Sequence, residues 1–291
     1  MDPNVALTRF VRSSDSAQLF YERQGRGRPL LLCDGILCEG HIWKYFVPAF
    51  ERDWECLHWH YPGHGRSADP PLFSDLSPQR LADDAARVVR HAEVDGVVVV
   101  GHSMGVQVAL ELWRRHRGLV RALVLLCGSP GRIVESFHES AILGYAVPLM
   151  DVGSRFLPGA TAKLWRKVPS EWVLWLAMHS REVNRRLISA ADLGQYLGRM
   201  TRVDFRLGLR MLQGAGNHDA TPFLPEVDVP VLVVAGMEDR FTPVKRSSLM
   251  ASAIPNSELM MVPGGTHSLP IEQPDLVNLR VRRFLADRLP G

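Results

Sequence analysis

The chain has 291 residues, of which 46% are hydrophobic and 22% charged, and its formal net charge is only +3. This charge is too small to predict a nucleic-acid partner, and no apolar run approaches the roughly 18 residues that a membrane span needs, so we expect no stable membrane insertion. The first residues lack a basic region followed by an apolar core, which predicts a cytoplasmic protein without a signal peptide.

Strands and helices alternate through the first part of the chain. Two short strands flank a polar turn near the N-terminus and predict an antiparallel hairpin. The later apolar runs do not alternate with polar residues, which is typical of strands covered on both faces. Because each is followed by a helical pattern, parallel strands with helical crossovers are favoured. The expected strands are 5–12, 18–22, 30–33, 54–59, 97–100 and 120–126, and the expected helices are 43–50, 78–93 and 106–115.

The alternation stops between residues 132 and 224 and then resumes. The interrupted stretch holds no apolar run typical of a buried strand, and its helical patterns are rich in large apolar side chains, so it predicts a helical insertion. The chain therefore divides into a core of residues 1–131 and 225–291 with a helical cap of residues 132–224. The last expected elements are strands at 229–235 and 257–262, a helix ending near 254 and a closing helix at 271–288.

The four cysteines are Cys33, Cys38, Cys56 and Cys127. None forms a CxxC pair, and three lie in apolar runs. We expect buried, reduced thiols, as in a reducing compartment, with a Cys33–Cys38 bridge as the alternative.

A Gly-x-Ser-x-Gly sequence joins the expected strand 97–100 to the helix that follows. Glycine at positions 101 and 105 permits a sharp bend and close packing of the helix on the strand. Such a turn presents the hydroxyl of Ser103 at the end of the strand as a nucleophile. The motif by itself arises in about one chain of ten by chance, so the alternative is a turn without chemistry.

Two further candidates follow the ends of later strands. Asp239 comes after strand 229–235, and His267 comes after strand 257–262. Because the carboxyl ends of parallel strands share one edge of a sheet, Ser103, Asp239 and His267 are expected to meet there. The histidine would remove the serine proton, and the aspartate would fix the imidazole tautomer. Glu238 is the alternative acid.

A serine nucleophile that attacks a carbonyl also needs donors for the oxyanion. The backbone N–H of Met104, directly after the serine, is the first candidate. The second belongs to the loop after strand 30–33, where we expect the N–H of Ile36, with that of Leu37 as the alternate.

These motifs together resemble the α/β-hydrolase superfamily. The resemblance rests on Asp34-Gly35, on Pro62-Gly63-His64-Gly65-Arg66-Ser67, on the serine motif, and on the segments of Asp239 and His267. It implies an eight-stranded, mostly parallel sheet flanked by helices, a helical lid inserted after the sixth strand, and no metal or organic cofactor. Two positions depart from the family pattern: Asp34 stands where histidine is frequent, and His60 stands where aspartate is frequent.

Serine at the elbow indicates acyl transfer to water rather than the alkyl-ester chemistry of an aspartate nucleophile. We therefore predict a serine esterase for a small or medium apolar ester, with water as the second substrate. The same triad permits C–C bond hydrolysis, lactone hydrolysis or perhydrolysis, and a non-catalytic ligand-binding protein is the alternative of another class. The oligomeric state is open. Expected substrate contacts are Asp34, Leu37, Trp165, Trp172, Trp175 and Phe241.

Overall fold

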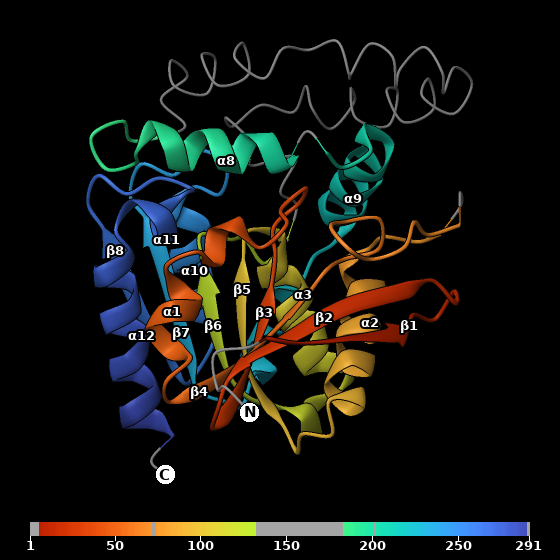
Figure 1. Ribbon diagram of the computed structural model, residues 1–291. Coiled ribbons are helices and arrows are strands. Elements are labelled where there is room, and N and C mark those ends of the chain that lie inside the picture. Colours follow the sequence, from red (N-terminus) through yellow and green to blue (C-terminus); the bar gives the residue numbers. More distant parts are fainter. Residues whose placement is uncertain (1–5, 72–73, 132–182, 201, 290–291) are drawn as a thin grey trace.

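The computed structural model describes residues 6–71, 74–131, 183–200 and 202–289. They form an eight-stranded sheet in the order β1-β2-β4-β3-β5-β6-β7-β8, with helices on both faces (Figure 1). The first three strands in this order pair antiparallel and the rest pair parallel, which confirms the predicted sheet. The strands are β1 (Leu7–Arg12), β2 (Gln18–Gly25), β3 (Arg28–Cys33), β4 (Trp54–Trp59), β5 (Val97–His102), β6 (Val120–Leu126), β7 (Val231–Gly236) and β8 (Ser257–Val262).

Two hydrophobic clusters lie on the two faces of this sheet. One packs the inner faces of α2, α3 and α10 against the strands, and the other packs α1, α11 and α12. The α-helices are α1 (Phe46–Phe50), α2 (Pro78–His91), α3 (Met104–Arg115), α8 (Ala190–Met200), α9 (Phe205–Asn217), α10 (Val244–Ala253), α11 (Leu269–Glu272) and α12 (Pro274–Arg288). The 3-10 helices are η1 (His41–Trp43), η2 (Arg117–Leu119) and η4 (Thr221–Glu226).

Two expected helices are broken by proline. The helix expected at 43–50 is instead η1 followed by α1, because the ring of Pro48 would clash with the carbonyl of the residue four positions earlier in a continuous helix. The closing helix expected at 271–288 is likewise two helices. Pro274 begins the second of them, at a position where its missing N–H leaves no hydrogen bond unmade.

The strand β5 forms the centre of the sheet, between β3 and β6. All six of its residues are buried, as expected of a strand covered on both faces. A Cβ on Gly101 would lie 2.3 Å from the carbonyl oxygen of Gly105, so only glycine allows α3 to begin this close to the strand. The central strand and the helix after it therefore form one tightly packed unit.

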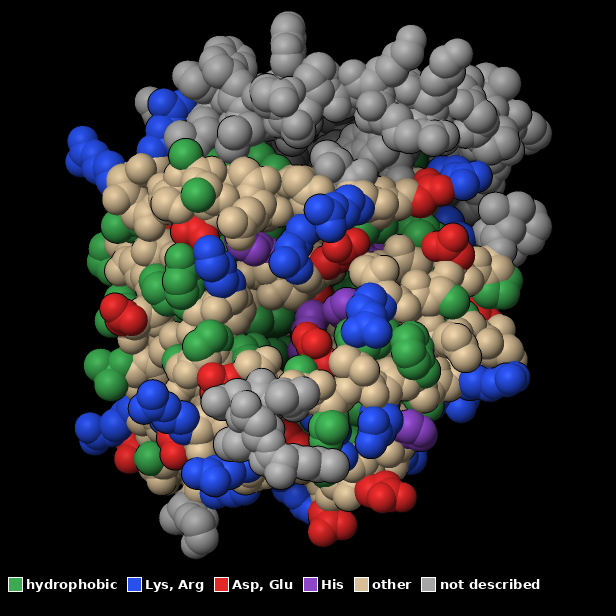
Figure 2. All heavy atoms as spheres, in the orientation of Figure 1, with side chains coloured by type: hydrophobic (Ala, Val, Ile, Leu, Met, Phe, Trp, Pro, Cys, Tyr) green, Lys and Arg blue, Asp and Glu red, His purple; other side chains and the backbone are tan. Residues whose placement is uncertain are grey.

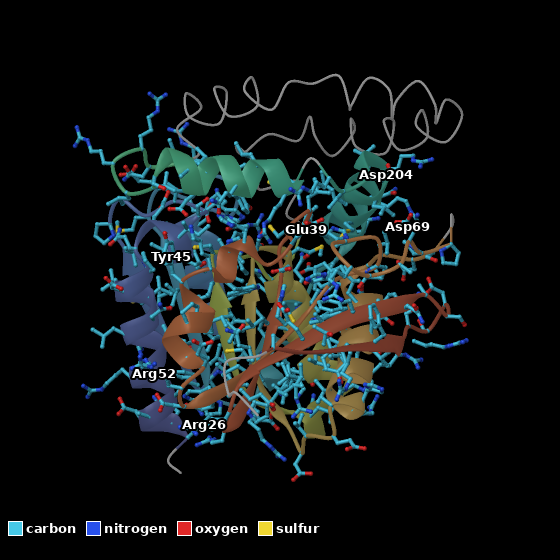
Figure 3. All side chains as sticks on the ribbon, viewed as in Figure 1. Arg26, Glu39, Tyr45, Arg52, Asp69 and Asp204 are labelled. Carbon is cyan, nitrogen blue, oxygen red and sulfur yellow. The ribbon has the colours of Figure 1, made fainter. Side chains whose placement is uncertain are left out.

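Helix α8 lies across the end of the sheet where the parallel strands finish (Figure 1). The carboxylate of Asp192 on α8 binds the Nζ of Lys44 at 2.6 Å and accepts a hydrogen bond from the hydroxyl of Tyr45 at 3.1 Å. The guanidinium of Arg199 donates to the carbonyl oxygen of Glu39 at 2.9 Å. Figure 3 shows Glu39 and Tyr45 below α8. These contacts fix α8 on the segment that follows β3.

Helix α9 has a different relation to the core. Met211 and Ala215, in its second half, are fully buried in the cluster that also holds α2 and α3. The side-chain amide of Gln107 on α3 donates to the carbonyl oxygen of Ala215 at 3.0 Å. The end of the stretch expected to form a cap thus packs into the core of the sheet and its helices, while residues 132–182 lie outside the described part of the chain.

All four cysteines are buried and unbridged, as predicted for reduced thiols. Among the described residues, no helix has the length and apolar character needed to cross a membrane.

Candidate active site

Ser103 stands between β5 and α3 in an unusual backbone conformation. Its φ is 57° and its ψ is −119°, a combination that residues other than glycine rarely adopt. Such a conformation costs on the order of 1–3 kcal/mol and persists only where the surrounding packing enforces it. Here the enforcing contact is the close approach of Gly105 to the carbonyl oxygen of Cys33 at the end of β3. The strained turn leaves the Ser103 side chain half-buried at the sheet edge.

The three residues expected to form the catalytic triad lie in one hydrogen-bonded chain. The Nδ1 of His267 lies 2.9 Å from Oδ2 of Asp239, and its Nε2 lies 2.9 Å from the Oγ of Ser103. A carboxylate only accepts, so Nδ1 carries the proton and Nε2 is left to accept the serine proton. This is the arrangement that a general base needs in order to activate a serine.

The carboxylate of Asp239 is held on both oxygens. The backbone N–H groups of Phe241 and Thr242 donate to Oδ1, each at 2.9 Å, and the hydroxyl of Thr242 donates to Oδ2 at 2.7 Å. Asp239 is only 4% exposed, whereas the adjacent Glu238 is exposed to solvent. The neighbouring acid that the sequence left open therefore points away from the imidazole.

His102, which precedes the nucleophile, contacts the loop that carries His267. Its Nε2–H donates to the carbonyl oxygen of His267 at 2.9 Å, and the two rings lie 5.0 Å apart between centroids. Burial and the neighbouring His267 lower the pKa of His102 to about 3, so the ring is neutral and Nε2 keeps its proton. His102 thus ties the nucleophile turn to the backbone of the residue that serves as base.

A second buried carboxylate supports the same loop. Glu272 accepts hydrogen bonds from the backbone N–H and the hydroxyl of Thr266, at 2.8 Å and 2.6 Å, and from the N–H of Asn184 at 3.0 Å. Burial raises the pKa of Glu272. No sequence motif indicated this contact, because Glu272 lies in a short helix after the last strand.

The expected oxyanion donors lie on the two sides of Ser103. Met104 begins α3, so its N–H has no acceptor within the helix. Ile36 belongs to the loop after β3, and the preceding Gly35 is so close that a Cβ there would lie 3.0 Å from the Cβ of Ser103. In the part of the chain that the structure describes, neither N–H is used by a backbone acceptor. The two N–H groups are therefore available to a ligand beside the hydroxyl.

The residues expected to contact substrate fall into three groups. Phe241 is half-buried with its ring 5.0 Å from that of His267. The side chain of Leu37, a residue with φ of 60°, points at α9, where a Cβ on Gly208 would lie 2.8 Å from it. Three tryptophans lie outside the described residues: Trp165, Trp172 and Trp175.

Asp34 does not lie where a substrate contact requires it. Its carboxylate is 1% exposed and accepts hydrogen bonds from the N–H of Gly40, the indole N–H of Trp43 and the imidazole of His58. The expectation that Asp34 contacts substrate is therefore replaced by a structural role, since both carboxylate oxygens are already occupied. His60, the other departure, accepts from the backbone N–H of Arg66 at Nδ1, at 2.9 Å.

Comparison with known proteins identifies the family. A model described as "Alpha/beta hydrolase family" matches residues 31–280. The chain belongs to the alpha/beta hydrolase family. It is accordingly an enzyme, a hydrolase.

Named relatives of this hydrolase cover several reactions. It is 32% identical to the pimeloyl-[acyl-carrier protein] methyl ester esterase of Methylococcus capsulatus, over 80% of this chain and 85% of the relative. It is 26% identical to the non-heme haloperoxidase of Rhodococcus erythropolis, over 95% of this chain and 98% of the relative. The structure of a thermophilic esterase from Thermogutta terrifontis superposes with a TM-score of 0.75 at 22% identity, over 97% and 99% of the two chains, which shows the shared fold.

Proposed function

We propose that this hydrolase cleaves carboxylic esters through an acyl-enzyme on Ser103. The observation that carries the proposal is the unbroken chain from the Oγ of Ser103 through His267 to Asp239, with 2.9 Å at each step. A serine oxygen gives an acyl ester that water attacks at the carbonyl carbon. The methyl ester esterase at 32% identity supports the same chemistry.

The proposed reaction has two halves, the acylation of Ser103 and the hydrolysis of the acyl-enzyme, and the same catalytic groups act in both. The Oγ of Ser103 attacks the ester carbonyl as Nε2 of His267 takes its proton, and the negative oxygen binds the N–H groups of Met104 and Ile36. When the tetrahedral intermediate collapses, the imidazolium gives that proton to the departing alkoxide. Water then attacks the acyl carbon as it loses a proton to the same nitrogen, and the negative oxygen again binds the two N–H groups. When this second intermediate collapses, the bond to Oγ of Ser103 breaks, the imidazolium returns the proton to Oγ, and the acid is released. Asp239 stabilises the imidazolium in both halves.

A panel of p-nitrophenyl esters of increasing acyl length tests the proposal. Ser103→Ala should lower kcat/KM by about 10⁴-fold or more, because it removes the nucleophile. Ser252→Ala is the matched control, since Ser252 is exposed on α10 and its hydroxyl bonds only the carbonyl oxygen of Leu249. A fluorophosphonate should label Ser103 covalently. Full activity in Ser103→Ala would refute the assignment of Ser103 as the nucleophile. A wild type that neither turns over any ester nor takes up the label would favour the ligand-binding alternative.

Perhydrolysis is the second candidate, and the haloperoxidase at 26% identity is the observation that favours it. In that reaction hydrogen peroxide replaces water as the attacking species on the acyl-enzyme, and a peracid is released. Adding peroxide to the ester assay and measuring peracid separates the two reactions. Lactone and dienoate substrates, included in the same panel, test the lactonase and C–C hydrolase alternatives.

A further inference from the structure

The carboxylate of Asp34 joins the two ends of the loop that carries Ile36. Its Oδ2 accepts from the N–H of Gly40 at 3.0 Å, and its Oδ1 accepts from the indole N–H of Trp43 at 2.6 Å. The hydroxyl of Tyr61 donates to the carbonyl oxygen of Asp34 itself at 2.7 Å. One residue thus holds the loop of residues 35–40 at its start and its finish. The position of the Ile36 N–H depends on this loop.

His58 supplies the charge that balances the Asp34 carboxylate. Its Nε2 lies 3.0 Å from Oδ2 of Asp34, and its Nδ1 lies 3.5 Å from Oε1 of Glu22 on β2. A neutral imidazole donates from one nitrogen only, so an imidazole between two carboxylates is stabilised as the cation. Burial lowers the pKa of His58, but the two carboxylates outweigh it and raise the pKa to about 9. His60, with its ring 5.1 Å away, is kept neutral by burial, which lowers its pKa to about 4.

The imidazole also contacts the loop sterically. Gly40 has a φ of +74°, and a Cβ on it would lie 2.3 Å from Cε1 of His58. A cavity of about 220 Å³ reaches the ring from outside and is lined by Glu22, Gly40, Trp43 and His58 among others. Figure 2 shows histidine and acidic side chains together in a hollow below α8. The ring is therefore packed against the loop and also borders a space that a small molecule can enter.

An unbalanced carboxylate at this place would oppose catalysis. Asp34 precedes Gly35, and Gly35 lies directly against Ser103. Negative charge develops on the substrate oxygen beside Ile36 in the transition state, and a buried anion nearby raises the energy of that state. The imidazolium of His58 removes most of this repulsion because it lies in contact with the carboxylate.

We propose that Asp34 and His58 are positioning residues whose ion pair fixes the oxyanion loop and cancels the Asp34 charge as the oxyanion forms. The inference rests on the proposed function in one respect, the use of the Ile36 N–H as an oxyanion donor. It gives a consequence for catalysis to the contact between an acid directly after β3 and a base on the neighbouring strand β4.

A double-mutant cycle separates this role from simple stabilisation. His58→Gln leaves Asp34 charged without its counterion, and kcat should fall by between about 10-fold and 100-fold with KM little changed. Asp34→Asn together with His58→Gln removes both charges, and kcat should recover to within about fivefold of wild type. His218→Gln is the matched control, because His218 is also a buried histidine and its Nε2 lies 2.9 Å from Oε1 of Glu111. This pair does not contact the loop of residues 35–40. His218→Gln should lower the melting temperature and leave kcat unchanged.

The cavity beside His58 allows a chemical rescue. In His58→Ala, millimolar imidazole should raise kcat by about tenfold with saturation, because it can enter, become protonated and pair with Asp34. Pyrazole has the same size but stays neutral near pH 7, and it should not rescue. All ratios are measured on an ester that wild type turns over, so absent wild-type turnover refutes the proposed function alone. If the wild type is active, two outcomes overturn the present inference. One is that the substitutions at Asp34 and His58 lower kcat multiplicatively in the double variant. The other is that pyrazole rescues His58→Ala as well as imidazole does.

Discussion

Replacing Gly105 by alanine tests how the packing beneath the nucleophile controls the site. A Cβ at this position would lie 2.1 Å from the carbonyl oxygen of Cys33 and 2.8 Å from that of Asp34, where ordinary contacts begin at 3.4 Å. Both neighbours are backbone atoms, so no side-chain rotation relieves the clash. Helix α3 and the end of β3 must separate by about an ångström, which we expect to cost about 3 kcal/mol of unfolding free energy.

The expected melting temperature falls by about 5 °C, because the unfolding entropy of a chain this long is large. The same displacement moves the start of the oxyanion loop relative to Ser103, and we expect kcat to fall by about 100-fold. Thermal denaturation by circular dichroism and ester kinetics at 25 °C measure the two effects. Gly118→Ala is the control, since a Cβ there meets nothing within 4 Å. If Gly105→Ala has the same melting temperature as Gly118→Ala and the kcat of wild type, the packing argument is wrong.

Two further substitutions probe the histidines. The free energy of unfolding should be larger in wild type than in His58→Gln, by an amount that is fully present below pH 6.5 and is lost as pH rises through about 9. The reason is that folding raises the pKa of His58 from 6.5 to about 9. Urea titrations should show the difference shrinking by about 3 kcal/mol, and a pH-independent difference would contradict it. The side chain of His102→Gln keeps an N–H donor near the carbonyl oxygen of His267, whereas that of His102→Asn does not reach it. We expect kcat to fall by about tenfold more in the asparagine variant. Equal kcat in the two variants would show that this hydrogen bond does not position His267.

The sequence predicted the positions of Ser103, Asp239 and His267 because each follows an apolar run that ends at the same edge of a parallel sheet. The local signal was sufficient there, since strand ends converge whatever the order of the strands. The pairing of Asp34 with His58 was not predictable in this way. It requires β3 to pair with β4 in the observed register. The chain connections that determine this pairing produce no sequence signal near either residue.

The contact of Glu272 with the loop that carries His267 was not predictable from the sequence for a related reason. Glu272 reaches Thr266 across a turn whose shape depends on how α11 packs on the sheet. The breaks that precede α1 and α12 were, by contrast, predictable from Pro48 and Pro274, because the steric limits on proline in a helix apply without any tertiary contact.

The two ends of the segment inserted between β6 and β7 meet on the core. The backbone N–H of Ala220 donates to the carbonyl oxygen of Pro130 at 2.9 Å, and Gly131 pairs with Asp219 in an isolated bridge. A segment that leaves and returns at one point can be exchanged between relatives without stretching the sheet. Chimeras that exchange this segment should therefore rejoin this chain ahead of Val203, because Val203, Leu207 and Met211 pack in the same buried cluster as α2 and α3.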